Sequence, residues 1–184
     1  MELKKQIIKA AEELFKTDGL QFTMQEVAAA LHISKKTIYT VYSSKETLLI
    51  DMIDDLFSDI HNVKAEIAAS PNSIEERIRA VIVALPEQYT TIDFRMLDAL
   101  EEKYPTAAKR VREHLENNWE PTIALIEEGI AMGCIRPVPI NVLKQMIVAS
   151  IECFLSGDKS DSGYADTLEA MIDMIMNGIK IRRC

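Results

Sequence analysis

A short segment, residues 34–42, carries the side chains of this chain that are best suited to contact a nucleic acid. On a helix of about 100° per residue, Lys35, Lys36, Tyr39 and Thr40 fall on one side and most apolar residues fall on the other. Ammonium groups and hydroxyls bind phosphates and base edges, whereas an apolar side packs on a neighbouring helix. The segment therefore predicts a helix with a basic, hydroxyl-bearing face for DNA. The competing interpretation is a solvated, lysine-rich surface on an ordinary helical bundle.

Two helix-start signals position this segment. Thr23, with Glu26 three residues later, has the spacing of a capping box and predicts a helix over residues 23–31. Ser34 is a favourable N-cap and predicts the helix over residues 34–42. Two short helices separated by a turn of about three residues form the helix-turn-helix arrangement.

Further helices are expected on both sides of this pair. One covers residues 2–16, and another begins at a cap formed by Ser43 or Ser44. Lys45 stands at the start of the latter helix, where free backbone N–H groups already favour an anion. The expected phosphate anchors are Thr23, Tyr39 and Lys45.

The composition divides the chain electrostatically. The 184 residues carry a net charge of −8, but residues 1–50 hold seven Lys against six acidic residues, whereas the remainder is strongly acidic. A hydrophobic content of 48% suffices for a folded core. No apolar run of about 20 residues predicts a membrane span, and the acid-containing start does not resemble a signal peptide. We expect a cytoplasmic protein without a membrane partner.

The hydrophobic pattern after residue 70 is helical throughout and predicts an all-α fold. The expected helices cover residues 73–89, 93–103, 106–132, 140–156 and 164–181. The apolar helices over residues 141–154 and 168–181 suit a two-fold four-helix interface between two copies. The alternative is that these two helices close the core of one chain.

Residues 23–49, TMQEVAAALHISKKTIYTVYSSKETLL, resemble the signature of TetR-family transcriptional repressors. That signature is a Thr-led helix containing Val-Ala, a turn, Ser-x-x-Thr-Ile-Tyr, an aromatic residue, and then Ser-Lys-Glu-x-Leu-Leu. The match is densest over residues 5–50. The family's usual turn glycine is His32 here, and His tolerates a positive φ better than most residues. Lys36 stands where a small residue is common in the family.

The resemblance implies a helix-turn-helix domain over residues 1–47 and a helical domain for effector binding and dimerisation over residues 48–184. The helix over residues 34–42 would enter the major groove of a pseudo-palindromic operator. A small apolar or amphipathic effector would release the dimeric repressor from DNA. The DNA-binding residues would be Thr23, Ser34, Lys35, Lys36, Thr37, Tyr39, Thr40 and Lys45.

Large side chains of the C-terminal part are the candidates for lining an effector pocket. Among them Trp119 stands out, because a buried indole N–H needs a polar partner. The candidate ligand-binding residues are Tyr89, Phe94, Met96, Trp119, Met132, Met146 and Phe154.

No catalytic or metal-binding motif accompanies these features. The sequence lacks a Gly-rich phosphate loop, GxSxG and HExxH, so we expect neither an enzyme nor a cofactor. Three Cys at unrelated spacings predict neither a disulfide framework nor a zinc site. Two other functions stay open: an effector-free architectural DNA-binding protein, and an all-α small-molecule-binding protein without DNA function.

Overall fold

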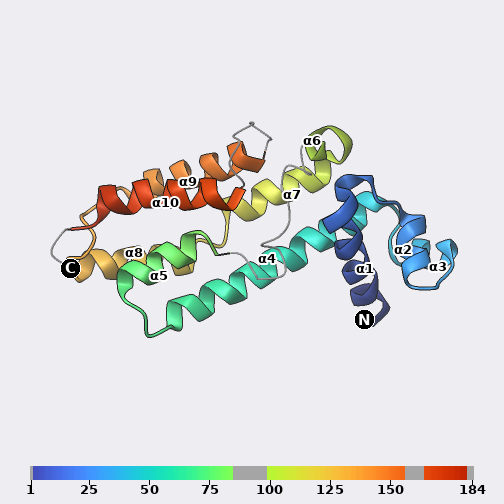
Figure 1. Cartoon of the computed structure of the whole chain (residues 1–184), viewed down its shortest axis with the longest axis horizontal. Coiled ribbons are helices and arrows are strands. Elements are labelled where there is room, and N and C mark those ends of the chain that lie inside the picture. The colour runs from blue at the N-terminus through green and yellow to red at the C-terminus, as the bar shows by residue number, and fades with distance from the viewer. Residues whose placement is uncertain (1, 85–98, 156–163, 182–184) are drawn as a thin grey trace.

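The computed structural model describes residues 2–84, 99–155 and 164–181 (Figure 1). These residues form helices and loops, so the predicted all-α fold class is confirmed. The helices are α1 (Glu2–Asp18), the 3-10 helix η1 (Gly19–Gln21), α2 (Met24–Ala30), α3 (Lys35–Val41), α4 (Lys45–Ala69), α5 (Ile74–Ile82), α6 (Leu100–Lys103), α7 (Pro105–Glu116), α8 (Glu120–Ala131), α9 (Ile140–Leu155) and α10 (Tyr164–Ile179).

The long helix α4 connects the two ends of the molecule. In Figure 1, α1, α2 and α3 cluster at one end, and α4 runs from them beneath α7 towards α5. At the other end α5 packs against α4, α8 and α10, and α9 lies beside α10. In the described part of the chain, no helix is long and apolar enough to cross a bilayer.

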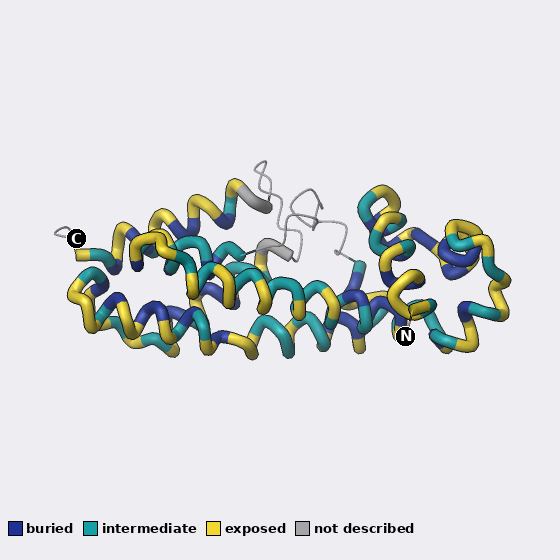
Figure 2. The backbone as a smooth tube through the Cα atoms, turned by 90° about the horizontal axis from the view of Figure 1, so that it is seen from below, coloured by how far each residue is buried: buried dark blue, intermediate teal, exposed yellow. Residues whose placement is uncertain are grey.

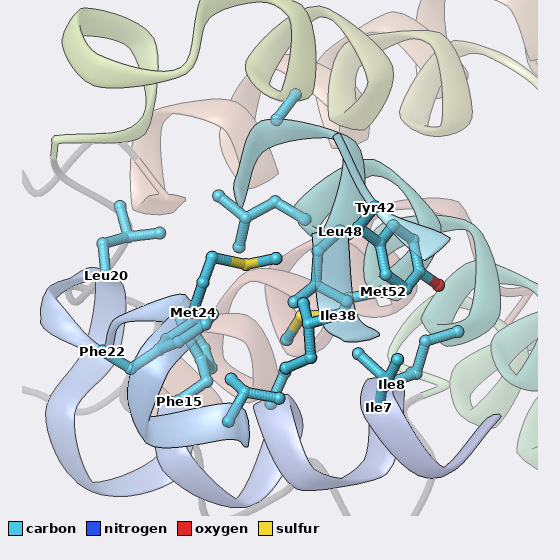
Figure 3. Close-up of a cluster of buried hydrophobic side chains, with 14 of the residues drawn as sticks. Ile7, Ile8, Phe15, Leu20, Phe22, Met24, Ile38, Tyr42, Leu48 and Met52 are labelled. Atoms are coloured by element: carbon cyan, nitrogen blue, oxygen red, sulfur yellow. The ribbon is translucent and has the colours of Figure 1, made fainter. Parts of the chain in front are cut away.

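A first hydrophobic core holds the N-terminal helices together. Figure 3 shows its side chains converging from α1, α2, α3 and α4, and Phe22, Ile38 and Leu48 are almost fully buried. Leu100 and Ala107, from α6 and α7, belong to the same cluster. This core therefore continues past residue 48, and the predicted domain boundary between residues 47 and 48 falls inside α4.

A second core fills the C-terminal bundle between α5, α8, α9 and α10. Ile147 and Ile172 are buried there, and Figure 2 shows the buried positions alternating with exposed ones along these helices. Gly129 permits the close packing of α8, because a Cβ at this position would lie 2.8 Å from Cγ1 of Ile135. Ile147 is thus a core residue of one chain, although its apolar helix also suited a contact between two copies.

The expected single helix over residues 106–132 is wrong, because α7 and α8 are separate helices. The chain turns at Asn118, which has a φ of 61°, and Asn117 Nδ2 donates to the Glu113 carbonyl at 2.6 Å. Asparagine side chains satisfy backbone groups at helix ends and tolerate positive φ. The apolar periodicity continues across this turn and therefore concealed it.

The C-terminal end of α10 returns to the segment after α8. Ile135 and Lys180 form an antiparallel bridge, and the Ile181 N–H donates to the Cys134 carbonyl at 2.7 Å. Cys134 takes part in a disulfide bond whose partner lies outside the described residues, whereas Cys153 is free and exposed. The cysteine spacings did not predict this bond, because it depends on tertiary contacts that sequence separation does not reveal.

Candidate nucleic-acid interface

Local hydrogen bonds define the starts of α2 and α3. Glu26 N–H donates to Thr23 Oγ1 at 3.2 Å, and Thr23 N–H donates to the Glu26 carboxylate at 2.7 Å. Thr37 N–H donates to Ser34 Oγ at 3.0 Å. The predicted capping box and N-cap are therefore confirmed. His32, in the turn between the helices, has a φ of 53° and occupies the conformation expected of the turn residue.

The two faces of α3 differ as the helical pattern predicts. Ile38 is fully buried in the first core, whereas Tyr39 is 45% exposed. Lys35 and Lys36 are exposed as well, and the described residues include no carboxylate paired with either one. Lys35 Nζ lies 5.9 Å from the centre of the Tyr39 ring, so both side chains share one face. This face carries two unneutralised cations at the surface.

The threonine hydroxyls near this face already donate to the protein. Thr40 Oγ1 donates to the Thr37 carbonyl at 2.6 Å, and Thr23 Oγ1 donates to the Glu26 carboxylate at 2.9 Å. Thr37 Oγ1 lies 2.8 Å from Ser34 Oγ. A hydroxyl has one proton to donate and two lone pairs that accept, so Thr40 and Thr23 offer acceptors in this arrangement. The free donors for phosphate oxygens are the two lysines and the Tyr39 hydroxyl.

Lys45 has a different environment from the two lysines of α3. Its ammonium donates to the Leu20 carbonyl at 2.7 Å and to the Phe22 carbonyl. It also lies 4.0 Å from the centre of the Phe22 ring and 5.5 Å from that of Tyr104. Burial lowers the pKa of Lys45. In this structure the ammonium connects α4 to η1 and to Tyr104, which follows α6, and the phosphate role expected of Lys45 remains a prediction.

Of the two residues that the sequence offered as the N-cap of α4, Ser43 and Ser44, the structure uses Ser44. The Thr47 N–H donates to Ser44 Oγ at 3.1 Å. Ser43 is exposed and precedes the cap. The N-terminal end of α4 also contacts α7, since the Thr106 N–H donates to the Glu46 carboxylate at 2.9 Å. The start of α4 is therefore hydrogen-bonded both to η1, through Lys45, and to α7, through Glu46.

Half of the predicted DNA-binding residues surround one open hollow of about 440 Å³: Thr23, Lys35, Tyr39 and Lys45. Ser34, Lys36, Thr37 and Thr40 do not line it. Lys103 of α6 and Tyr104, which lies between α6 and α7, complete the wall, and sequence reasoning missed both. Nothing in the local pattern around Lys103 indicates DNA contact, because only the fold brings Lys103 to the same hollow as Lys35 and Tyr39. The hollow gathers three lysines in a space open to an anionic partner.

A second, smaller cavity of about 50 Å³ lies in the C-terminal part between α4, α7 and α9. Trp119 lines it and is buried, but its indole N–H donates to the Leu115 carbonyl at 2.7 Å. Met132 and Met146 do not line this cavity and are instead 59% and 56% exposed. Their size and apolarity suggested a pocket, but both project to the surface. Tyr89, Phe94 and Met96, and the side chain of Phe154, lie outside the described residues.

Metal-ligating side chains do not gather in the part of the chain that the structure describes, where no group of three or more His, Cys, Asp or Glu is suitably placed. The capped helix pair and its exposed basic face instead define a helix-turn-helix protein. Residues 7–52 match the model of the bacterial regulatory proteins of the tetR family. This range contains α2, α3 and the start of α4, and it confirms the resemblance that these residues carry. Over residues 7–52 the chain is therefore similar to the bacterial regulatory proteins of the tetR family.

Relatives and solved structures match over nearly the whole chain. An uncharacterized HTH-type transcriptional regulator, YvaF, of Bacillus subtilis (strain 168) is 24% identical, and the match covers 96% of this chain and 95% of that protein. A transcriptional regulator of the TetR/AcrR family from Thermobifida fusca YX-ER1 is 23% identical, with a TM-score of 0.66 over 96% of this chain and 97% of that one. The regulator FadR from Bacillus subtilis, solved in complex with stearoyl-CoA, is 20% identical, with a TM-score of 0.63 over 94% of this chain and 95% of that one.

Proposed function

We propose that this chain is a dimeric, ligand-responsive repressor that acts in the cytoplasm and binds a pseudo-palindromic DNA operator. The observation that carries the proposal is the exposed, unneutralised face of α3 with Lys35, Lys36 and Tyr39, held by two capped helices over a buried core. A helix presented in this way enters the major groove in helix-turn-helix proteins. Two half-sites about 34–36 Å apart would then match the two-fold symmetry of a dimer.

The contacts suggest how α3 and its neighbours divide the work on DNA. Lys35, Lys36 and Tyr39 supply free donors, which suit phosphates or the acceptor atoms of guanine. Thr40 retains acceptor capacity and suits the exocyclic amino group of adenine or cytosine. Lys103 adds a cation to the hollow beside α3. Ser34, Thr37 and Thr23 are assigned mainly to holding α2 and α3 in place.

The dimer is proposed to form through exposed faces of α9 and α10. Met146 on α9 is 56% exposed and Met174 on α10 is 71% exposed, and Val142 is 50% exposed one turn before Met146. Exposed apolar side chains at these densities are typical of interaction surfaces, where Met is enriched. Two such helices from each copy would form a four-helix interface across a two-fold axis.

A matched pair of substitutions tests this surface. Met174→Asp places a charge in the proposed interface, and we expect monomers by analytical ultracentrifugation and at least about 100-fold weaker operator binding, because the two half-sites no longer bind as one unit. Met132→Asp changes another exposed methionine, at the end of α8, and should leave the dimer intact. A dimer that withstands Met174→Asp would exclude this face.

The effector is proposed to be a small amphipathic molecule that binds in the C-terminal part. The support is the cavity beside Trp119 and the stearoyl-CoA complex of the FadR structure, which shares this fold. An effector that prefers the DNA-incompetent arrangement by about 1–3 kcal/mol weakens DNA binding by about 5- to 150-fold.

Selection of binding sites from a random duplex library, with the full-length protein, tests the function directly. We expect enrichment of one pseudo-palindrome, protected in a footprint. Binding that depends on salt but selects no sequence would favour the architectural alternative. A protein that retains no duplex at low salt would favour a small-molecule-binding protein without DNA function.

A further inference from the structure

The cavity beside Trp119 combines apolar walls with a single available cation. Phe57 and Ile60 of α4, Leu115 of α7 and Ile151 of α9 contribute apolar lining. Lys64, also on α4, completes the wall, and its ammonium lies 5.4 Å from the centre of the Trp119 ring. A mostly apolar cavity with one convergent charged group is the usual form of a small-molecule site.

Among the described residues, 2–84, 99–155 and 164–181, the ammonium of Lys64 has no carboxylate as an ion-pair partner. It lies over the face of the Trp119 indole. Burial lowers the pKa of Lys64. A desolvated cation is costly unless an anion accompanies it, so an incoming anion gains more here than at an exposed lysine.

Three of the other polar groups that line the cavity, on His114, Asn117 and Trp119, already have partners. His114 Nε2 lies 2.7 Å from Asp54 Oδ1, and the His114 ring stacks on Phe57 with 4.5 Å between the ring centres. The same Asp54 accepts hydrogen bonds from Arg110. Asn117 donates to a backbone carbonyl, as does the Trp119 indole. Lys64 therefore decides the charge of the group that the cavity accepts.

The volume restricts the size of that group. One water needs roughly 10–15 Å³ in this measure, and a dry cavity of about 150 Å³ holds benzene. A cavity of about 50 Å³ is too small for an aromatic ring but holds a carboxylate with its first carbon atoms. His61, which also lines the cavity, is exposed to solvent.

We propose that the cavity binds the carboxylate of an aliphatic monocarboxylic acid, with the Lys64 ammonium as its counter-ion and the Trp119 indole as an adjoining wall. The inference rests on the proposed function, since it names the chemical class of the effector. It selects a free carboxylate over a neutral or cationic head group of the same chain length.

Titration of the full-length protein with octanoate, 1-octanol and octylammonium tests this selection. Trp119 is the only tryptophan of the chain, so its fluorescence reports the site, and calorimetry gives the affinity. We expect octanoate to bind at least about tenfold more tightly than either analogue, because a hydrogen-bonded ion pair replaces an unpaired, partly buried charge. Equal affinities for octanoate and 1-octanol, or preference for octylammonium, would overturn the proposal.

Two lysine variants separate the site from its surroundings. Lys64→Met should weaken octanoate binding about tenfold or more without lowering the melting temperature of the free protein, because an unpaired, partly buried charge is removed. Lys144→Met is the matched control: Lys144 lies 5.9 Å from the same indole, but it donates to the Glu116 carbonyl and does not line the cavity. Loss of binding in Lys144→Met alone would refute the role of Lys64.

Two further measurements test this site. The first compares a free acid with its coenzyme A ester, and the second compares ligand binding with release of operator DNA. Octanoyl-CoA has no free carboxylate. If it binds through Lys64 and octanoate does not, the assignment to a carboxylic acid is overturned. Octanoate that binds through Lys64 without releasing operator DNA supports the site and contradicts the effector role. Release by other compounds, with no octanoate binding, contradicts the site and leaves the repressor function standing.

Discussion

Two lysines of the N-terminal helices, Lys36 and Lys45, should affect different properties when they are replaced. One substitution should change DNA binding, and the other should change the stability of the folded chain. Lys36 is exposed on α3 and is paired with no carboxylate in the described structure, whereas the ammonium of Lys45 is held by the Leu20 and Phe22 carbonyls. We expect Lys36→Ala to act on the salt dependence of operator binding. We expect Lys45→Met to act on the folded chain instead.

The expected magnitude for Lys36→Ala follows from counterion release. Each lost phosphate contact reduces the slope of log K against log salt by about 0.9, and a dimer loses two contacts, or about 1.8. Between 50 and 200 mM salt, the affinity of the variant should therefore fall about tenfold less than that of the natural protein. Fluorescence anisotropy with a labelled operator, over four or five salt concentrations, measures the slope.

Lys45→Met keeps the aliphatic stem but removes a charged donor from two backbone carbonyls. Hydrogen bonds to a charged group are worth about 1.5–3 kcal/mol, and partial exposure of Lys45 reduces this to about 1 kcal/mol. For a chain of this length that is a fall of about 2–4 °C in melting temperature. A Lys45→Met variant with unchanged melting temperature and a slope reduced by about 1.8 would refute this reasoning, because Lys45 would then be a phosphate anchor.

Two further substitutions test the packing that supports the site. Gly129→Ala should destabilise the chain by about 1–2 kcal/mol in denaturant melts, because the new Cβ meets Ile135. Gly178→Ala is the control and should be neutral or stabilising, because no atom lies within 4 Å of its Cβ. Equal effects of the two substitutions would exclude the close approach at Gly129. Although burial raises it, hydrogen bonds from Arg110 and His114 hold the pKa of Asp54 below its usual value. Asp54→Asn should therefore cost about 1 kcal/mol at neutral pH, and the deficit should shrink as the pH falls below about 4 towards the folded pKa, where the natural carboxylate is also protonated; a deficit independent of pH would contradict this.

The helix-turn-helix could be predicted because its determinants lie within a few residues of one another. Thr23 and Glu26 cap the same helix, and Ser34 lies three residues before the N–H group that it accepts from. His32 occupies a turn whose length is fixed by these two helix starts. Local chemistry of this kind is complete in the sequence, so the structure reproduces it with shifts of one residue at the boundaries.

Which residues of the C-terminal part are buried could not be predicted from the sequence. Burial there depends on apolar contacts between helices that are far apart in the chain. Periodicity identifies the apolar residues of a helix, but it does not tell which of them the chain itself covers. Ile147 and Met146 are neighbours on α9, yet the first is buried and the second is 56% exposed. The turn at Asn118 was hidden by the same continuity of apolar residues.

The charged residues show most clearly what separates a position in the sequence from a role in the structure. Lys35, Lys45 and Lys64 are each a lysine on a helix, and the residue type does not distinguish their roles. The fold leaves Lys35 at the surface, directs Lys45 to two carbonyls, and places Lys64 in an apolar cavity. Because an ammonium binds whichever anion or dipole its surroundings leave available, these three environments favour DNA, the protein itself and a small acid, respectively.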